Sequence, residues 1–258
     1  MPKNMKNTST LGIGCLLATG LTLSLRENAN AEFVLSGFSG VSSAFNSNLH
    51  LHENNGTDLT FHDASYKTRD FESPLYYGGR LTYFLDRQSP WGFGLEFFHS
   101  KVYLDEGSSV HVTGTRNGAP VNDTEPVSNT FYDFNCSHGL NYLTADTFYR
   151  FFLGPPDGKS FLTRIQPYLG LGLGITIPHV EVELANQPRF EEYEFGGLGV
   201  QAMAGVSFAI TKHIQLFTEY KFTYADLDKL DFSTGSTSGN ITFDSMANHL
   251  IFGASYRF

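Results

Sequence analysis

The chain ends in the stretch His249-Leu-Ile-Phe-Gly-Ala-Ser-Tyr-Arg-Phe258, and the pattern of its side chains decides the fold prediction. The even-numbered positions from Leu250 to Phe258 are all apolar or aromatic, whereas the odd-numbered positions are mostly smaller or polar. A repeat of two residues is typical of a β-strand whose two faces meet different surroundings. This stretch therefore predicts a strand with one apolar face and one more polar face.

Seven further segments repeat this alternation, at residues 33–45, 75–85, 91–98, 143–151, 168–175, 198–208 and 214–222. The connections between them alternate between short ones, such as 86–90 and 211–212, and long polar ones, such as 46–73 and 105–131. Bacterial outer-membrane barrels have short periplasmic turns and long outer loops, and the strand ending in Phe258 resembles their C-terminal strand. We therefore predict an all-β fold, an antiparallel up-and-down transmembrane β-barrel of eight strands in the bacterial outer membrane.

The composition agrees with strands that face lipid, and it excludes two other classes of protein. Charged residues make up 17% of the chain and aromatic residues 15%, with 26 glycines. After the N-terminal region, no segment approaches the 18 or more consecutive apolar residues of a membrane helix. The chain is therefore not predicted to be a helical membrane protein, and its many aromatic residues argue against simple disorder.

Residues 1–31 are predicted to be a cleaved export signal, followed by a single barrel domain over residues 32–258. Lys3 and Lys6 precede an apolar stretch, and Ala29-Asn30-Ala31 supplies the small residues of a cleavage site. Losing three cations and one anion with this segment would take the net charge from −9 to −11. A chain this acidic, without a basic cluster, argues against nucleic acid as a partner. Cys136 would be the only cysteine left, so no internal disulfide is expected.

The interior of the predicted barrel is expected to contain charged side chains. Eight strands enclose an interior just wide enough for side chains to fill, so we expect an ion-pair network there and no open channel. The inward-facing charged residues are Arg80, Glu96, Asp146, Arg150, Glu219, Lys221 and Arg257. On the outer face, near the periplasmic ends, we expect an aromatic girdle of Tyr83, Trp91, Tyr149, Phe151, Tyr256 and Phe258.

The sequence contains no G-x-S-x-G, P-loop, dinucleotide-binding or H-E-x-x-H motif. It does place ionisable residues at the outer ends of several strands. The third strand ends in a group made of Glu96, His99, Lys101 and Tyr103, and His138 lies at the start of the fourth.

A second group follows the fifth strand, where alternation places His179, Glu181 and Glu183 on one face. Pro178 removes a backbone donor, and we considered that a bulge there turns this face toward the lumen. Imidazole and carboxylate groups together can bind a divalent metal or act as acid and base. The simpler interpretation is that acids at the outer rim are solvated or bind the divalent ions that bridge lipopolysaccharide.

The chain resembles the lipid A oxidase family over most of the segment that follows residue 31. The resemblance rests on ordered stretches, of which the most specific are His99-Ser-Lys-Val-Tyr103 and Pro178-His-Val-Glu-Val182. Others are Tyr76-Tyr-Gly-Gly-Arg80, Gly139-Leu-Asn-Tyr-Leu-Thr144 and Phe217-Thr-Glu-Tyr-Lys-Phe-Thr-Tyr224. The resemblance implies an oxygen-dependent oxidation of the proximal glucosamine of lipid A to 2-aminogluconate, helped by a divalent metal cation.

The roles of individual residues are our own hypothesis, since the resemblance brings no catalytic assignment with it. We expect His99, His179 and Glu181 to be metal ligands or acid and base groups, with Glu96 as a fourth catalytic candidate. The candidate substrate-binding residues are Lys101, which would meet a lipid A phosphate, together with Tyr103 and His138.

Two alternative functions stay open at this point. A lipid A deacylase would need a histidine–serine pair facing lipid, but His99 and Ser100 are consecutive residues of a strand and point to opposite faces. A surface antigen or adhesin would use the barrel only as an anchor for binding loops. The predicted partners of the chain are lipid A or lipopolysaccharide and the outer membrane, and the barrel is expected to be a monomer.

Overall fold

The computed structural model describes residues 31–154, 160–234 and 237–258. The predicted export signal, apart from Ala31, lies outside the described residues and stays a prediction. Residues Ala31–Phe258 form one compact unit. Within the described residues, no helix is long and apolar enough to cross a membrane.

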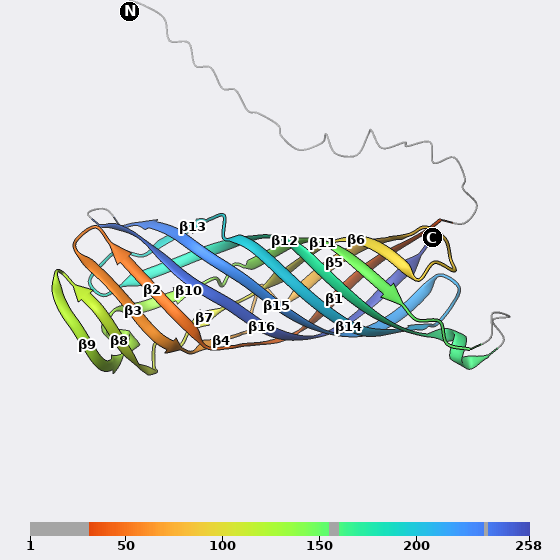
Figure 1. The fold of residues 1–258 in the computed structure, drawn as a ribbon, viewed down its shortest axis with the longest axis horizontal. Coiled ribbons are helices and arrows are strands. Elements are labelled where there is room, and N and C mark those ends of the chain that lie inside the picture. Colours follow the sequence, from red (N-terminus) through yellow and green to blue (C-terminus); the bar gives the residue numbers. More distant parts are fainter. Residues whose placement is uncertain (1–30, 155–159, 235–236) are drawn as a thin grey trace, which may run out of the picture. The chain divides into compact units, whose positions relative to one another are not determined.

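Eight antiparallel strands form a closed ring. They are β1 (Glu32–Ala44), β5 (Tyr77–Phe84), β6 (Trp91–Ser100), β11 (Leu140–Arg150), β12 (Ile165–Leu184), β14 (Gly197–Ala209), β15 (Ile214–Ser233) and β16 (Ser238–Arg257). Each strand pairs with the next in this order, and β16 pairs with β1 to close the ring. Figure 1 shows them side by side along the barrel. The predicted up-and-down barrel of eight strands is confirmed as this ring.

The described sheet has 16 strands, more than the predicted eight, because the long connections also form strands. The first group extends the sheet from β16: β2 (Ser47–Glu53), β3 (Thr57–Ala64), β8 (Ser109–Arg116) and β9 (Ala119–Pro126). The second extends it from β12: β13 (Phe190–Tyr193), β10 (Phe131–Asn135), β7 (Tyr103–Leu104) and β4 (Tyr66–Lys67). Two short 3-10 helices, η1 (Val127–Asn129) and η2 (Phe161–Arg164), complete the described elements. In β2, β3 and the first half of β8, alternate residues are buried, so these strands bury one face, which irregular loops would not do.

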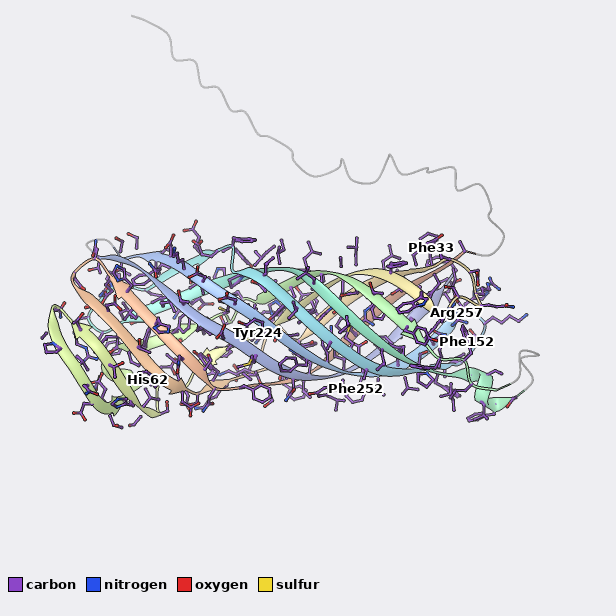
Figure 2. All side chains as sticks on the ribbon, viewed as in Figure 1. Phe33, His62, Phe152, Tyr224, Phe252 and Arg257 are labelled. Carbon is purple, nitrogen blue, oxygen red and sulfur yellow. The ribbon has the colours of Figure 1, made fainter. Side chains whose placement is uncertain are left out.

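The polarity of the barrel wall reverses along its length, as strand β15 shows. In its first half the outward Tyr220 is exposed and the inward Lys221 is buried. Six residues further on, the outward Asp226 is exposed and the inward Leu227 is buried. Figure 2 shows the outward direction of Phe252 on the neighbouring strand β16. The strand keeps its alternation, but the apolar residues change from the outer face to the inner face.

This reversal marks where the barrel leaves the membrane. A lipid-facing wall must be apolar outside, whereas a wall in water must be polar outside and can pack an apolar core inside. Beyond the reversal the interior is filled by a buried apolar cluster that includes Leu49, Leu59, Phe61, Phe131, Phe134 and Phe243. The part that carries this cluster is therefore an extracellular extension, and it lies at the end of the barrel opposite Phe258 (Figure 1).

Within the membrane-spanning part, the predicted ion-pair network is present. Arg80 contacts Glu96 and Glu219, and Lys221 contacts Glu96. Asp146 is an exception, since it accepts a hydrogen bond of 2.7 Å from the Gln201 amide and has no cation as partner among the described residues. Because Arg80, Glu96 and Lys221 are almost completely buried, their pairing offsets the cost of removing charge from water.

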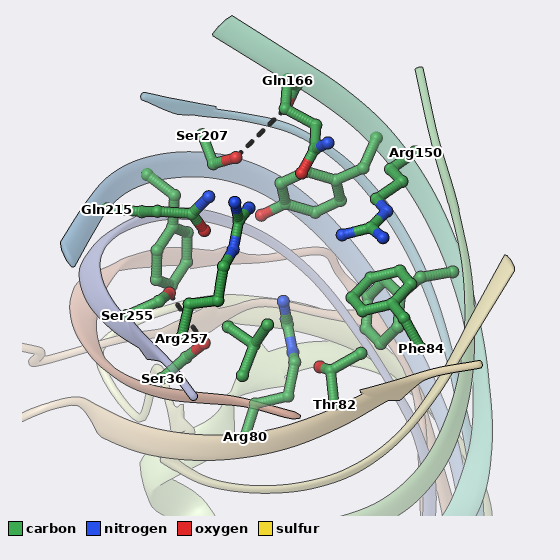
Figure 3. A pocket seen from close by; sticks show the side chains of 14 residues that line it. Ser36, Arg80, Thr82, Phe84, Arg150, Gln166, Ser207, Gln215, Ser255 and Arg257 are labelled. Carbon is green, nitrogen blue, oxygen red and sulfur yellow. Dashed lines mark hydrogen bonds between the residues drawn. The ribbon is translucent and has the colours of Figure 1, made fainter. Parts of the chain in front are cut away.

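A second ion-pair cluster lies at the end of the barrel with the short turns. Glu32 accepts a hydrogen bond of 2.6 Å from Arg150 and also contacts Arg257. Both arginines were predicted to face the interior, whereas Glu32, the residue directly after the predicted cleavage site, was not. Figure 3 shows Arg80, Arg150 and Arg257 around a small cavity of about 60 Å³ between the two clusters. A cavity of this size is too small to be a channel.

The barrel is therefore expected to carry no steady ion current. The Arg80–Glu96–Lys221 network closes the membrane-spanning part, and the apolar cluster closes the extension. Single-channel recording of the purified protein in planar bilayers tests this. Reproducible current steps that scale with the number of inserted molecules would contradict the closed interior.

The expected aromatic girdle lies on the outer wall near the short turns. Trp91 and Tyr149 have ring centroids 4.9 Å apart, and Tyr149 and Phe151 are 5.0 Å apart. Tyr256 and Phe258 make a similar contact of 4.9 Å. These rings lie at the periplasmic end of the apolar wall, where aromatic residues typically anchor a barrel to the membrane interface.

Candidate functional site

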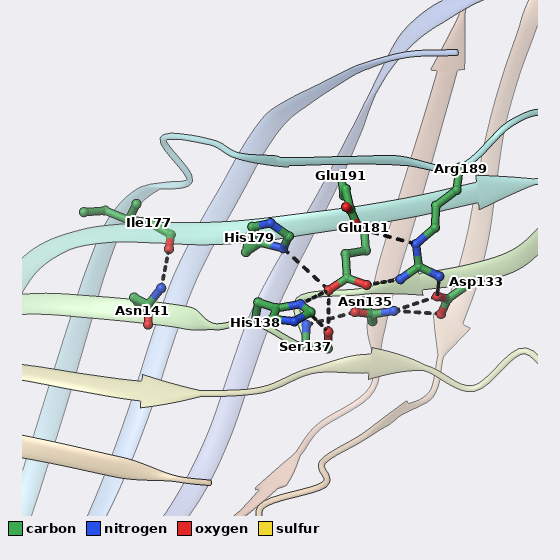
Figure 4. A network of polar contacts seen from close by, with 10 residues as sticks. All are labelled: Asp133, Asn135, Ser137, His138, Asn141, Ile177, His179, Glu181, Arg189 and Glu191. Atoms are coloured by element: carbon green, nitrogen blue, oxygen red, sulfur yellow. Dashed lines mark hydrogen bonds and ion pairs between the residues drawn. The ribbon is translucent and has the colours of Figure 1, made fainter. Parts of the chain in front are cut away.

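Three potential ligand groups meet on the outer wall of the barrel, just beyond the apolar band. The ligating atoms of His138, His179 and Glu181 all lie within 4.8 Å of one another. The Glu181 Oε1 atom is 2.6 Å from His138 Nδ1 and 3.5 Å from His179 Nδ1 (Figure 4). Glu181 is only 2% exposed, whereas the His138 side chain is 59% exposed. We call His138, His179 and Glu181 the histidine–glutamate cluster.

Strand β12 places His179 and Glu181 on the outward face without a bulge. The strand runs without a break from Ile165 to Leu184, and His179 and Glu181 lie on the same face as the exposed Leu169. The one-residue shift lies in the neighbouring segment, because Thr176 pairs with Gly197 of β14 whereas His179 pairs with Tyr193 of β13. The Pro178 carbonyl accepts a hydrogen bond of 2.9 Å from the Glu194 amide, so the ladder continues across the proline. The hypothesis that a bulge turns this face toward the lumen was therefore wrong, although the shared face was predicted correctly.

The turn between β10 and β11 brings His138 over β12. Gly139 in this turn has a φ of +129°, a conformation that favours glycine. Its carbonyl accepts a hydrogen bond of 2.8 Å from the His179 amide, so the turn is tied to β12 directly beside the cluster. A Cβ atom at Gly139 would lie 2.5 Å from Asn141 Oδ1 and 2.6 Å from His99 Nδ1.

Gly139→Ala is therefore expected to disrupt the cluster. We expect it to destabilise the turn by more than about 1 kcal/mol, because alanine fits neither the backbone conformation nor the space. Gly107→Ala is the matched control, since Gly107 has an ordinary φ and a Cβ atom there would meet no atom closer than 3.4 Å. Thermal unfolding in detergent micelles measures both, and equal melting temperatures for the two variants would contradict the expectation.

A shell of polar residues holds Glu181 in place. Ser137, His138 and Arg189 all contact its carboxylate. Arg189 Nη1 also donates to Asp133 Oδ2 at 2.9 Å, and Figure 4 shows this pair beside Glu181. Burial by itself raises the pKa of Glu181, but the hydrogen bonds from Ser137 and His138 and the charge of Arg189 hold that pKa below its ordinary value. Glu181 is therefore ionised at neutral pH.

His99 lies near the cluster but does not belong to it. Its Nδ1 atom is 3.0 Å from Asn141 Oδ1, and its ring stacks on Tyr77 at 5.0 Å. Asn141 in turn donates to the Ile177 carbonyl at 3.0 Å. Tyr77, His99, Asn141 and Ile177 thus form one cross-strand row, which we call the boundary row because it lies directly below the cluster.

The predicted trio of His99, His179 and Glu181 is therefore not assembled, and His138 takes the place of His99. Asn141 and Tyr77 hold His99 in the boundary row, whereas the turn at Gly139 folds His138 toward Glu181. The sequence predicted His138 as a substrate-binding residue, and the structure places it beside His179 and Glu181.

Two other predicted site residues are buried away from the cluster. Glu96 lies in the lumen with Arg80 and Lys221, because it is three residues from His99 and so faces the opposite side of β6. Lys101 is 2% exposed and donates to the Glu72 carbonyl at 2.8 Å, which leaves it inaccessible to a lipid phosphate. Burial lowers the pKa of Lys101, against the opposing charges of Glu72 and of a second nearby carboxylate.

Tyr103 lies on β7, which pairs with β10 on the side away from β12. The Arg69 guanidinium lies 4.3 Å from the centre of its ring. Burial raises the pKa of the Tyr103 hydroxyl, and the nearby Ser137 hydroxyl and Arg69 charge oppose this. Tyr103 is therefore a neutral, half-buried neighbour of the cluster.

Sequence reasoning missed Ser137, Asp133, Arg189 and Tyr193. Ser137 directly precedes His138, and that adjacency was a signal that could have been used. Arg189 and Tyr193 belong to a connection that pairs with β12, and only the register between β12 and β13 brings them to the cluster.

The donor atoms of the cluster fit a divalent cation. His179 Nδ1 is buried and has no hydrogen-bond partner among the described residues, so its lone pair is available to a metal. Two imidazoles and one carboxylate form the donor set of non-haem iron(II) oxygenases, and a similar set binds catalytic zinc. Within the described ranges, no other group of three or more histidine, cysteine or acidic side chains has this spacing.

The closed ring, the exposed apolar band and the periplasmic aromatic girdle together define a bacterial outer-membrane β-barrel protein. A family model described as the outer membrane protein beta-barrel domain matches residues 16–258. The chain belongs to this family and is a protein of the bacterial outer membrane.

Solved barrels are similar to the chain at low sequence identity. Neisserial surface protein A is 14% identical, with 88% of this chain and 99% of that chain covered at a TM-score of 0.40. OprG from Pseudomonas aeruginosa is 14% identical, with coverages of 89% and 96% and a TM-score of 0.40. The outer-membrane protease OmpT from Escherichia coli is 8% identical, with coverages of 89% and 97% and a TM-score of 0.43. No curated protein matches the chain.

Proposed function

We propose that this barrel is an enzyme that modifies lipid A in the outer leaflet, and that it oxidises the proximal glucosamine with molecular oxygen. The observation that carries the proposal is the position of the histidine–glutamate cluster. It faces outward, one rung beyond the boundary row, where the wall changes from apolar to polar. A bound amphiphile would lay its acyl chains against the apolar band and its sugar against the cluster.

The donor set supports oxidation. His138, His179 and Glu181 would hold a divalent cation, which when bound would supply redox chemistry toward oxygen. Oxidation of a glucosamine hemiacetal at its anomeric carbon removes two electrons and two protons, and molecular oxygen that accepts both becomes hydrogen peroxide. Water then opens the resulting lactone to 2-aminogluconate. Arg189 and Ser137 would orient Glu181 throughout, since both contact its carboxylate.

An exposed aromatic residue beside the cluster supports a sugar as the substrate. Tyr193 pairs with His179 across the strands, and the two rings are 4.5 Å apart. Tyr193 is nevertheless 58% exposed, so one side of its ring is open. An open aromatic ring at the level of the lipid headgroups offers a platform for the apolar face of a sugar ring.

A lipid A deacylase is the second candidate, and one observation favours it. Ser137, His138 and Glu181 converge at the same place, and they are the residue types of a hydrolytic triad. Their geometry differs from that of a working triad, because Ser137 Oγ, at 3.2 Å, and Glu181 Oε1 both meet Nδ1 of His138. A triad requires the carboxylate and the serine on opposite nitrogens of the ring, so we rank this function second.

Mass spectrometry of lipid A separates the candidates. The protein and its His179→Ala and Ser137→Ala variants would be expressed with aeration in a host that lacks the modification and whose lipid A has a free anomeric hydroxyl on the proximal glucosamine. His52→Ala is the matched control, because His52 is exposed on the extension and lies outside the cluster. Heat-modifiable migration on a gel shows that each barrel has folded.

The oxidase proposal expects a gain of one oxygen on the proximal sugar that His179→Ala abolishes and Ser137→Ala largely retains. Loss of an acyl chain that Ser137→Ala abolishes would replace the oxidase by the deacylase. Unchanged lipid A with a folded wild-type barrel would refute both enzymes and leave the barrel as an anchor for a surface protein.

A further inference from the structure

A separate polar cavity lies among the tips of the extracellular extension. It has a volume of about 180 Å³, and its polar lining includes Glu53, Asn55, Arg116, Asn117, Asn129 and Gln187. These residues come from the tips of the β2–β3 and β8–β9 hairpins, from η1 and from the turn after β12. In Figure 1 both hairpin tips lie at the end of the barrel far from Phe258. We call this space the tip cavity.

Hydrogen bonds fix the walls of the tip cavity before any ligand is present. Asn55 Oδ1 accepts from the Thr57 amide at 2.9 Å, and Thr57 Oγ1 accepts from the Asn117 amide at 3.2 Å. The Asn55 and Asn117 side-chain NH₂ groups have no partner among the described residues, so both are available to a ligand. A wall that is already ordered loses little conformational entropy on binding.

Glu53 shows what kind of ligand the tip cavity takes. It is 5% exposed, and its Oε1 atom accepts a hydrogen bond of 2.7 Å from Gln187 Nε2. Its second carboxylate oxygen has no hydrogen-bond partner, and no cation lies within 4.0 Å, as far as the described residues show. This second oxygen is open to the cavity, and a carboxylate oxygen accepts hydrogen bonds, so a ligand with hydroxyl donors suits this site.

An anion is not the preferred ligand of the tip cavity, because Glu53 is acidic and the basic lining residue is already paired. Arg116 is the basic residue in the lining, and it already contacts Glu125 with both terminal nitrogens and Thr130 at 3.0 Å. The remaining lining offers amide donors and acceptors beside the apolar surface of Leu184. Hydroxyl groups on a compact ring match this combination, since each hydroxyl both donates and accepts.

We infer that the tip cavity binds one neutral sugar unit of a glycan, with sugar hydroxyls donating to Glu53 and accepting from Asn55 and Asn117. The glycan could be the sugar chain of lipopolysaccharide in the same membrane or a glycan on another surface, and the chemistry is the same for both. This site is separate from the histidine–glutamate cluster and does not depend on its activity.

Binding to the folded full-length barrel in nanodiscs tests this inference. The probes are oligosaccharide released from lipopolysaccharide by mild acid and a panel of methyl glycosides of neutral hexoses and N-acetylhexosamines. Isothermal titration calorimetry would follow wild type, Glu53→Gln and Asn117→Gly. Glycine suits the positive φ of Asn117. Asn117→Gly therefore removes the side-chain amide and retains the backbone turn. Asp58→Asn is the control, because Asp58 is exposed on the same hairpin and outside the cavity.

The expected result is saturable binding that Glu53→Gln weakens about 10-fold or more, that Asn117→Gly also weakens, and that Asp58→Asn leaves unchanged. Binding of the lipopolysaccharide oligosaccharide alone would identify the source as the same membrane, whereas binding of other glycosides alone would identify a foreign glycan. Either result supports the site. No binding of any probe by the wild-type barrel, or binding that neither cavity variant weakens, would overturn it.

Discussion

Lys221→Met is expected to lower the free energy of unfolding of the barrel by about 3–5 kcal/mol, the usual cost of removing one partner from a buried ion pair. Lys221 is fully buried, contacts Glu96 and lies 3.8 Å from Glu219. Once the charge of Lys221 is removed, Arg80 alone would have to balance the buried carboxylates of Glu96 and Glu219. Methionine has similar length and fills the space, so the loss reports charge and not a cavity.

Denaturant unfolding in detergent micelles, followed by Trp91 fluorescence, measures this effect. Adding Glu96→Gln to Lys221→Met is expected to recover part of the loss, because it removes the carboxylate left without a partner. Lys67→Met is the matched control, since Lys67 is largely exposed and pairs with Asp105 at 2.7 Å. An exposed pair contributes at most about 1 kcal/mol. A loss for Lys221→Met no larger than that of the control would show that the network is not needed for stability.

His179→Ala is expected to reduce lipid A oxidation by about 100-fold or more, and to weaken divalent cation binding in parallel. Mutation of a residue that only hydrogen-bonds to a metal ligand typically lowers metal affinity or activity by about 10–100-fold. His179 would be a ligand itself, so its loss should cost at least as much. His138→Ala is expected to have the same effect. Treatment with a chelator should likewise abolish oxidation, and re-addition of the cation should restore it.

His99→Ala distinguishes the site seen in the structure from the one expected from sequence. Because His99 is held by Asn141 and Tyr77, its loss should leave cation binding within a few-fold of wild type. Equilibrium dialysis of the purified barrels with iron(II), cobalt(II) or zinc(II) measures the affinity of each variant. If His99→Ala loses the cation and His138→Ala retains it, the histidine–glutamate cluster is not the metal site.

Alternation in sequence was sufficient to predict the ring, because lipid outside and side chains inside impose a period of two on each strand. The same period predicted that Arg80, Glu96, Glu219 and Lys221 face inward. It did not predict Glu32, which stands beside the predicted cleavage site and whose partners come from β11 and β16. The extension was missed because its strands keep the period but reverse their polarity, so they looked like polar loops.

The sequence by itself determined the class of protein, the direction of each ring strand and one shared face, that of His179 and Glu181. These features depend on the alternation of residues within one strand, and the sequence of that strand alone is enough to show it. Only the tertiary structure decided that His138 completes the cluster and that His99 and Glu96 do not. That outcome depends on the left-handed turn at Gly139 and on the registers of β10, β11 and β13 against β12. A register is a relation between distant segments, set by the packing of the whole barrel, so no single stretch of sequence contains it.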